Sequence, residues 1–171
     1  MYAGKILSII AGILTLLGTF LFSWIAIDSY GVIYYANGLG IIENLSTMFT
    51  DAETLETILD VPAFAFYIIA GVFILFLISG VLQILGVKWR ILIIIGTIAV
   101  LLVTTLIFLG SADVLNREEW VVNILGTDEQ LVEDFIPWKI FDVGTLDIGM
   151  YLLWLGGIIG IAAAVYGPSE L

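Results

Sequence analysis

The chain has 171 residues, of which 61% are hydrophobic and only 12% are charged, and its mean hydropathy is +1.17. A soluble domain is about 45–50% apolar and about 25% charged. This composition therefore excludes an ordinary soluble fold, whose core could not bury so much apolar surface. The formal charge of −11 disfavours a nucleic-acid partner, because nucleic acids bind basic surfaces. We expect an integral membrane protein with a few polar segments outside the bilayer.

Four uncharged stretches have the length of membrane-spanning helices, at residues 6–27, 63–87, 91–110 and 148–167. Each contains about 20 residues or more, which at ~1.5 Å per residue crosses a ~30 Å hydrocarbon core. Helix is expected because every backbone polar group in lipid must be paired within its own segment. The sequence predicts an all-α membrane protein: one tetraspan domain over residues 1–171, with a four-transmembrane-helix bundle.

Basic residues near these stretches predict the orientation. Lys5 precedes the first span, and Lys88 and Arg90 lie in the short turn between the second and third spans. The positive-inside rule places all three in the cytoplasm, together with both termini. The connectors over residues 28–62 and 111–147 are then extracellular, and they carry six and nine acids respectively. These acids either keep the loops solvated or bind cations or a basic partner.

Aromatic residues recur near the predicted span ends. Amphipathic rings are enriched at membrane interfaces, so we expect them to anchor the helices there. They are Trp24, Tyr30, Tyr34, Tyr35, Trp89, Trp138 and Tyr166.

Small residues at four-residue spacing predict which helices pack closely. Helices in lipid associate through close packing at such positions, since lipid tails are as apolar as Leu. The first and fourth spans carry the clearest stripes, and we expect these two helices to touch; the alternative is contact between copies. The stripes are Gly4, Ser8 and Gly12, and Gly156, Gly160 and Ala164.

The predicted spans contain no Asp, Glu, Lys, Arg or His, and the three prolines lie near span ends or in loops. Ion pathways and proton relays generally need ionisable groups inside the bilayer, and transporter sites use broken helices. Gln83 is the most polar side chain within a span. We expect it to bond a neighbouring helix rather than a substrate, which disfavours a transporter.

The first loop shows a hairpin pattern. Residues 30–35 and 39–42 are two β-prone runs, and Asn37-Gly38 between them is a favoured turn dipeptide. A lone hairpin is marginal, so we expect residues 138–143 of the second loop to add a third strand. The sequence thus predicts a small extracellular β-sheet built from both loops.

Each loop also shows a short helix pattern. Thr50 and Glu53 have capping-box spacing before an apolar run in the first loop, and Thr127 and Gln130 repeat that spacing in the second. A further short helix is expected to begin near Asn116.

Catalytic, cofactor and metal sites are not expected. The chain has no Cys and no His, which excludes thiolate nucleophiles, disulfides, His- or Cys-ligated metals and His-dependent triads. Acid pairs at residues 128–129 and 133–134 offer oxygen ligands for Ca²⁺, but no EF-hand pattern accompanies them, and solvated helix faces are the favoured interpretation. Asn44 opens an N-glycosylation sequon on the predicted outer side.

Two segments late in the chain carry Gly, Pro and aromatic residues at the spacing of known sequence motifs. The first is similar to the Asp-Phe-x-x-Pro segment of claudin second loops, and the second to the Gly…Tyr-x-Gly-Trp opening of the claudin fourth helix. Their residues are Asp134, Phe135 and Pro137, then Gly149, Tyr151 and Trp154.

The first half of the chain adds to this resemblance. Gly38-Leu39 is similar to a first-loop motif of claudins, although Gly40 stands where the family has Trp, and Trp24 corresponds to a Trp at the end of the first helix. The layout as a whole resembles the claudin and peripheral-myelin-protein superfamily. The resemblance implies an extracellular sheet over a left-handed four-helix bundle, and lateral association or contact between membranes. Claudins have two loop cysteines, whereas this chain has none.

We therefore expect a non-enzymatic tetraspan protein of the cell membrane that mediates lateral self-assembly or adhesion. Its partners would be lipid and either a second copy or another membrane protein. The alternatives are an accessory subunit of a larger membrane complex and a cation channel or transporter. Partner contacts are expected at five residues, for which packing within the ectodomain is the other interpretation. They are Tyr34, Tyr35, Trp120, Asp134 and Phe135.

Overall fold

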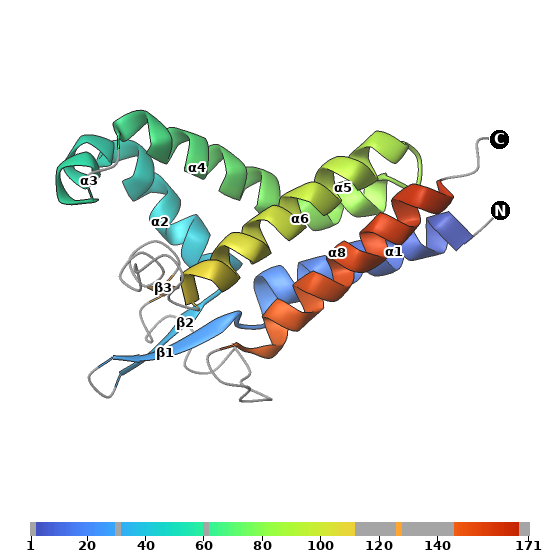
Figure 1. The fold of residues 1–171 in the computed structure, drawn as a ribbon, viewed down its shortest axis with the longest axis horizontal. Coiled ribbons are helices and arrows are strands. Elements are labelled where there is room, and N and C mark those ends of the chain that lie inside the picture. The colour runs from blue at the N-terminus through green and yellow to red at the C-terminus, as the bar shows by residue number, and fades with distance from the viewer. Residues whose placement is uncertain (1–2, 30–31, 60–61, 112–125, 128–145, 168–171) are drawn as a thin grey trace.

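A computed structural model describes residues 3–29, 32–59, 62–111, 126–127 and 146–167, and this part of the chain is mostly helical (Figure 1). The helices are α1 (Ala3–Leu16), which continues into a π-helical turn η1 (Leu17–Leu21), α2 (Gly38–Thr50), α3 (Ala52–Leu59), α4 (Ala63–Leu77), α5 (Ser79–Leu85), α6 (Arg90–Ser111) and α8 (Ile148–Tyr166). The strands are β1 (Ile25–Ser29), β2 (Val32–Ala36) and β3 (Gly126–Thr127).

Three of these helices are each long and apolar enough to cross a membrane: α1 with η1, α6 and α8. The pair α4 and α5 passes the same test only when the two are taken together, and it is bent by 47°. These helices indicate a membrane protein with three candidate spans, or four if the bent pair is one span.

The bend between α4 and α5 interrupts what the sequence predicts as one continuous helix over residues 63–87. It falls at Ile78, directly before Ser79-Gly80, and the Ser79 hydroxyl donates to the Phe76 carbonyl oxygen at 2.6 Å. Kinks without proline occur at such Gly/Ser pairs. As a result, α4 runs toward α2 and α3 and contacts both of them and α6, while α5 stays packed against α1 and α6 (Figure 1).

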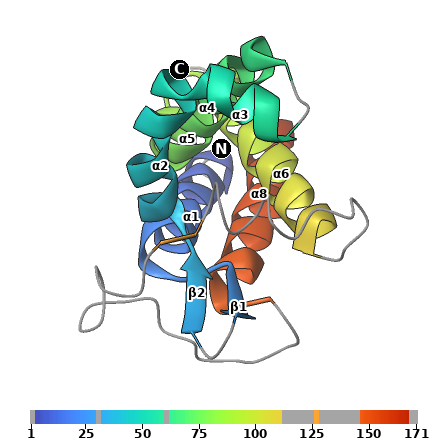
Figure 2. The ribbon, with the colours of Figure 1, turned by 90° about the vertical axis from the view of Figure 1, so that its left-hand side faces the viewer.

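Helices α1, α5, α6 and α8 lie side by side. α8 contacts both α1 and α6, and α5 contacts both of these as well (Figures 1 and 2). The apolar core lies toward the end of these helices that carries the strands. Its largest fully buried side chains include Trp24, Phe76, Met150 and Leu153.

The first span ends earlier than the sequence predicts. Residues 6–27 were expected to be helical, but η1 ends at Leu21 and Phe22 is extended (φ −120°, ψ 144°). Trp24 and Ile25 continue the apolar run beyond the helix, Ile25 is the first residue of β1, and both are buried. A short apolar run fits a buried strand as well as a helix, so periodicity alone could not place this boundary.

The predicted turn at Asn37-Gly38 is wrong. β1 pairs antiparallel with β2, with Ile25 opposite Ala36, so the hairpin lies earlier in the chain. The Asn37 side-chain oxygen instead accepts the N–H groups of Leu39 and Gly40, at 2.9 and 3.1 Å. This is an N-cap, and it begins helix α2 where a strand was expected.

A third strand pairs with β2, but it is not the one predicted. β3 places Thr127 opposite Tyr35 and Gly126 opposite Ala36. The predicted strand over residues 138–143 lies outside the described residues.

The short helix predicted after Thr50 is present as α3, which begins at Ala52. Thr50 is instead the last residue of α2, where its hydroxyl donates at 3.2 Å to the Ser46 carbonyl oxygen, and Asp51 is the residue directly before α3. In the second loop, Thr127 of the repeated capping pattern lies in β3, and Gln130 lies outside the described residues. The further helix predicted near Asn116 also lies outside the described residues.

Candidate functional site

A neutral polar cluster lies in the interior of the helices around Gln83 of α5. The Thr15 hydroxyl donates to Gln83 Oε1 at 2.7 Å, and Gln83 Nε2 donates to Thr97 Oγ1 at 3.3 Å. The Ser8 hydroxyl donates to the backbone oxygen of Gln83. These residues are buried and come from α1, α5 and α6. The prediction that Gln83 bonds neighbouring helices is therefore confirmed, and the bonds satisfy groups that lipid could not.

Glycines around this cluster allow the helices to approach closely. A Cβ on Gly156 would lie 2.5 Å from Thr15 Oγ1, and one on Gly160 would collide with Thr97 Oγ1. A Cβ on Gly12 would lie 2.6 Å from the Gly80 carbonyl oxygen. The interior at this depth is thus filled by backbone and short polar side chains.

The predicted packing stripes divide between several neighbours. Gly156 of α8 faces α1, as expected for contact between the first and last spans, and a Cβ on Gly4 would meet the backbone of Gly167 just after α8. Ser8 and Gly12, however, face α5 rather than α8. The remaining stripe residues are Gly160, which faces α5 and α6, and Ala164, which is half-buried.

Trp24 is the centre of a second cluster, where β1 leaves the helices. Its side chain is 0% exposed, and its indole N–H donates to the Gly18 carbonyl oxygen at 2.6 Å. Its ring meets Phe76 edge-on, with 5.4 Å between the ring centroids. The prediction that Trp24 anchors the chain at the membrane interface is wrong, because a fully buried ring cannot contact headgroups.

Other aromatics of the predicted anchor set lie elsewhere. Trp89 and Tyr166 are exposed, and the Lys88 ammonium lies 4.8 Å from the Trp89 ring centroid. Tyr34 and Tyr35 lie in β2, and Tyr30 and Trp138 lie outside the described residues.

A buried clasp next to Trp24 joins β1 to α8. The Ser23 hydroxyl donates to the carboxylate of Asp147, which is only 2% exposed. The Asp147 N–H donates to the Trp24 carbonyl oxygen, and the Gly149 N–H donates to the Ser23 carbonyl oxygen, both at 2.9 Å. A buried carboxylate needs such partners, because burial without them is costly. We call Ser23, Trp24, Asp147 and Gly149 the clasp.

Gly149 is required by the geometry of the clasp. A Cβ there would lie 2.7 Å from the Phe22 carbonyl oxygen and closer still to that of Ser23. Just beyond, Leu146 forms an isolated antiparallel bridge with Ile25. The start of α8 is therefore fixed to the start of β1 by backbone contacts that have no room for a side chain.

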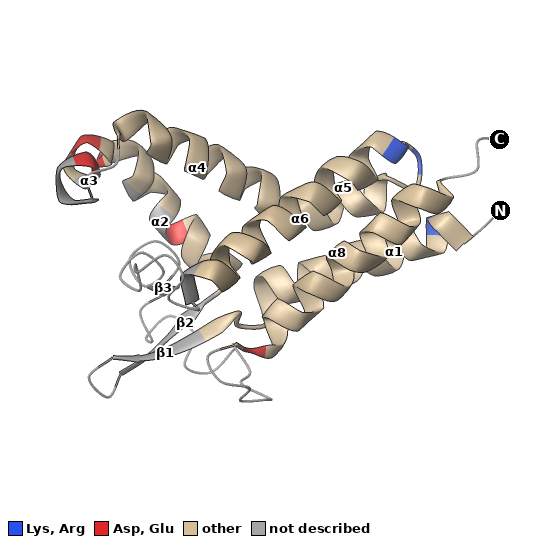
Figure 3. Ribbon diagram, in the orientation of Figure 1, with Lys and Arg blue, Asp and Glu red and all other residues tan. Residues whose placement is uncertain are grey.

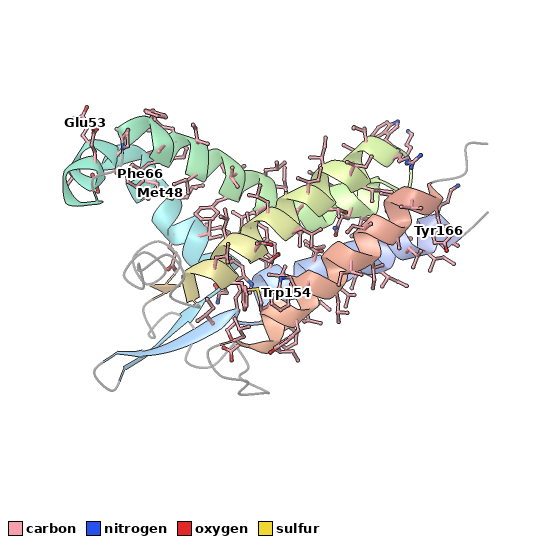
Figure 4. All side chains as sticks on the ribbon, viewed as in Figure 1. Met48, Glu53, Phe66, Trp154 and Tyr166 are labelled. Atoms are coloured by element: carbon pink, nitrogen blue, oxygen red, sulfur yellow. The ribbon has the colours of Figure 1, made fainter. Side chains whose placement is uncertain are left out.

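The remaining residues of the claudin resemblance that the structure describes lie in α2 and α8. Trp154 of α8 meets Phe108 and Tyr151 edge-on, at centroid distances of 5.4 and 6.1 Å, and is labelled in Figure 4. Gly38 begins α2 against Thr19, and Leu39 follows it with an exposed side chain. Asp134, Phe135, Pro137 and Trp120 lie outside the described residues, and Asn44 lies within α2.

Sequence reasoning missed two members of the clasp, Ser23 and Asp147. A signal for Asp147 was present, since it is the acid directly before the fourth apolar run, where Asp is favoured as the residue that precedes a helix. Ser23 carries no such signal, because a serine at the end of an apolar run is compatible with many environments.

The side chains of both clusters join neighbouring elements through hydrogen bonds. The hydroxyl of Ser23 contacts a carboxylate without an imidazole base, and the Gln83 cluster is neutral. Within the described ranges, no group of three or more acidic side chains is placed to hold a metal ion. The chain matches no family model, no curated protein and no solved structure, which leaves its own residues as the basis for a function.

Proposed function

We propose that this chain is a non-enzymatic tetraspan protein of the cell membrane, whose four-helix bundle supports an extracellular platform for lateral self-assembly or adhesion. The four spans would be α1 with η1, the bent pair α4–α5, α6, and α8. The platform would comprise the strands with α2 and α3, and the resemblance to claudins implies that the bundle is left-handed.

The clasp is the observation that carries this proposal. An adhesive or assembling surface must keep its shape while it is bound, which requires its strands to be fixed to the membrane domain. The clasp supplies this attachment through a buried carboxylate, a fully buried indole and backbone contacts at Gly149. Disulfides serve this purpose in many extracellular sheets, and this chain has none.

The distribution of charge supports the orientation. Lys5, Lys88 and Arg90 gather at one end of the helices, whereas the described acids lie at the other end or beyond it (Figure 3). The positive-inside rule makes the first end cytoplasmic. Both termini would then be inside, and the clasp and α3 outside.

The acidic platform favours some partners over others. The two connectors that would form the platform carry six and nine acids, so two platforms that face each other across a gap would repel, while copies side by side in one membrane need not bring these acids together. We therefore give lateral assembly first place, with adhesion to a basic partner second.

The experiment compares two serine-to-alanine substitutions. Wild type, Ser23→Ala in the clasp and Ser46→Ala on the exposed face of α2 are purified in mild detergent, weighed by native mass spectrometry and imaged in phosphatidylcholine bilayers. The proposal predicts homo-oligomers for wild type and Ser46→Ala, and fewer or smaller ones for Ser23→Ala with unchanged helix content.

Other outcomes favour the alternatives. A monodisperse monomer in both detergent and bilayer contradicts self-assembly, and a fixed complex with a different membrane protein favours the accessory-subunit interpretation. Cation flux in liposomes that is lost when loop acids are neutralised favours a channel and contradicts the proposal.

A further inference from the structure

Helix α2 runs across the end of the bundle rather than along it (Figures 1 and 2). It contacts α4, α3 and η1, and its inner face is buried through Ile41 and Met48. Met48 and Phe66 of α4, which is also buried, are labelled in Figure 4. The orientation of α2 is therefore fixed by packing, and its outer face is defined.

The outer face of α2 divides lengthwise into an apolar edge and a polar edge. Ile42 and Phe49 are 50% and 45% exposed. They lie along one line of the helix, because they are seven residues apart, which is about two turns. Glu43, Ser46 and Thr50 are also exposed, and they lie further round the helix at spacings of three and four. Leu39 lies on the same line in the first turn and is 38% exposed, so the division begins after that turn. Such a division is typical of a helix that lies at a boundary between lipid and water.

The apolar edge is continuous with the exposed surface of α4. The rings of Phe49 and Tyr67 are stacked, with 6.0 Å between their centroids, and both side chains are partly exposed. From Tyr67 the exposed surface of α4 continues along a stripe with helical spacing. The stripe consists of Phe64, Tyr67, Ile68, Gly71, Ile74 and Leu75.

This continuity favours lipid as the occupant of the apolar edge. α4 belongs to a candidate span, and its exposed apolar stripe faces outward, where bilayer lipid would surround it. The next segment, α3, exposes Glu53 and Glu56, which belong in water. Acids at this end also disfavour anionic headgroups, so neutral zwitterionic lipid is the expected environment.

We propose that α2 is an interfacial helix, whose Ile42–Phe49 edge inserts among the acyl chains of the outer leaflet while Glu43, Ser46 and Thr50 face water. The level of the membrane surface would then follow the line that separates these two edges. The inference needs α4 to cross the membrane, and it is independent of whether the platform binds a partner.

The test uses single cysteines, since the chain has none of its own. Ile42→Cys and Phe49→Cys report on the apolar edge, and Glu43→Cys and Ser46→Cys on the polar edge. Each variant carries a nitroxide label in phosphatidylcholine bilayers, and its collisions with oxygen, which concentrates in lipid, and with a water-soluble nickel chelate are measured by electron paramagnetic resonance. Circular dichroism checks that each variant keeps its helix content.

The inference predicts opposite behaviour at the two edges. Labels at Ile42 and Phe49 should be reached several-fold more by oxygen than by the chelate, and labels at Glu43 and Ser46 the reverse. Because Phe49→Cys removes a stacking partner, Ile42→Cys gives the deciding value. Equal access of the chelate to all four labels would overturn the inference and place α2 in water. Shielding of Ile42 from both reagents would also overturn it, and spin–spin broadening would then show that a second copy covers the edge.

Discussion

At the scale of single residues, the hydrogen bond between the Ser23 hydroxyl and the Asp147 carboxylate joins two distant parts of the chain. Both are buried where β1 meets α8, and the carboxylate accepts from that hydroxyl. A hydrogen bond to a carboxylate contributes about 1.5–3 kcal/mol, and this contribution is lost when the hydroxyl is removed.

Ser23→Ala should therefore lower the free energy of unfolding by about 2 kcal/mol. Ser46→Ala is the matched control, because its hydroxyl is exposed and makes only a 3.5 Å contact with the Glu43 carbonyl oxygen. We expect the control to stay within about 0.5 kcal/mol of wild type. Unfolding in mixed micelles with increasing sodium dodecyl sulfate, followed by circular dichroism, measures both. Equal stability of the two variants would show that the clasp contributes nothing.

Gln83→Leu should cost about 1–2 kcal/mol in the same assay, since hydrogen bonds between helices in membranes contribute about 0.6 kcal/mol each and at most about 1.7. The loss is modest because the bond from Ser8 goes to the backbone oxygen of residue 83, which the substitution keeps. Ile98→Leu, at a position that is 58% exposed on α6, is the control and should be neutral. An increase in stability on Gln83→Leu would contradict the role given to this cluster.

At the scale of elements, close contact between α8 and the end of the first span depends on Gly149. Gly149→Ala places a Cβ 2.7 Å from the Phe22 carbonyl oxygen, and backbone cannot move aside without shifting β1. We expect a loss of at least about 2 kcal/mol, in the range of overpacking. Gly71→Ala is the matched control on α4, where a Cβ meets nothing within 4 Å. It should be neutral or stabilising, because Ala favours helix over Gly by about 1 kcal/mol. Unfolding in the same mixed micelles measures both variants, and equal stability of the two would disprove the close contact.

The elements also show what the sequence predicts and what it does not. The long apolar stretches were placed correctly as α6 and α8, since only a spanning helix requires about 20 apolar residues without charge. Where two local patterns compete, the prediction was wrong. Asn37-Gly38 suits a hairpin turn, but Asn37 is also a good N-cap, and the structure uses it to begin α2.

Tertiary contacts explain the other differences. Trp24 was assigned to the interface because tryptophan is frequent there, yet its bond to Gly18 and its contact with Phe76 come from distant parts of the chain. The partner of Ser23 lies 124 positions away. No local pattern can report such a pairing, so the clasp could be found only from the fold.

At the scale of the whole molecule, charge and hydropathy point to the same orientation. The bases lie at one end of the helices and the described acids at the other end or beyond it (Figure 3), as the proposed orientation requires, with the tight turn at Lys88 in the cytoplasm and the platform outside. The proposed orientation needs four spans, in which α4 and α5 would cross the membrane together in spite of their 47° bend.

Residue 51 lies between α2 and α3, before that bent span in the chain, and residue 88 lies just after it. Asp51→Cys and Lys88→Cys, each the only cysteine in its chain, are expressed in intact cells and treated with a membrane-impermeant maleimide, before and after permeabilisation. The account predicts that Asp51→Cys reacts in intact cells and that Lys88→Cys reacts only after permeabilisation. Reaction of both positions from the same side would contradict it, because α4–α5 would then not cross the membrane and the platform would have no bundle to support it.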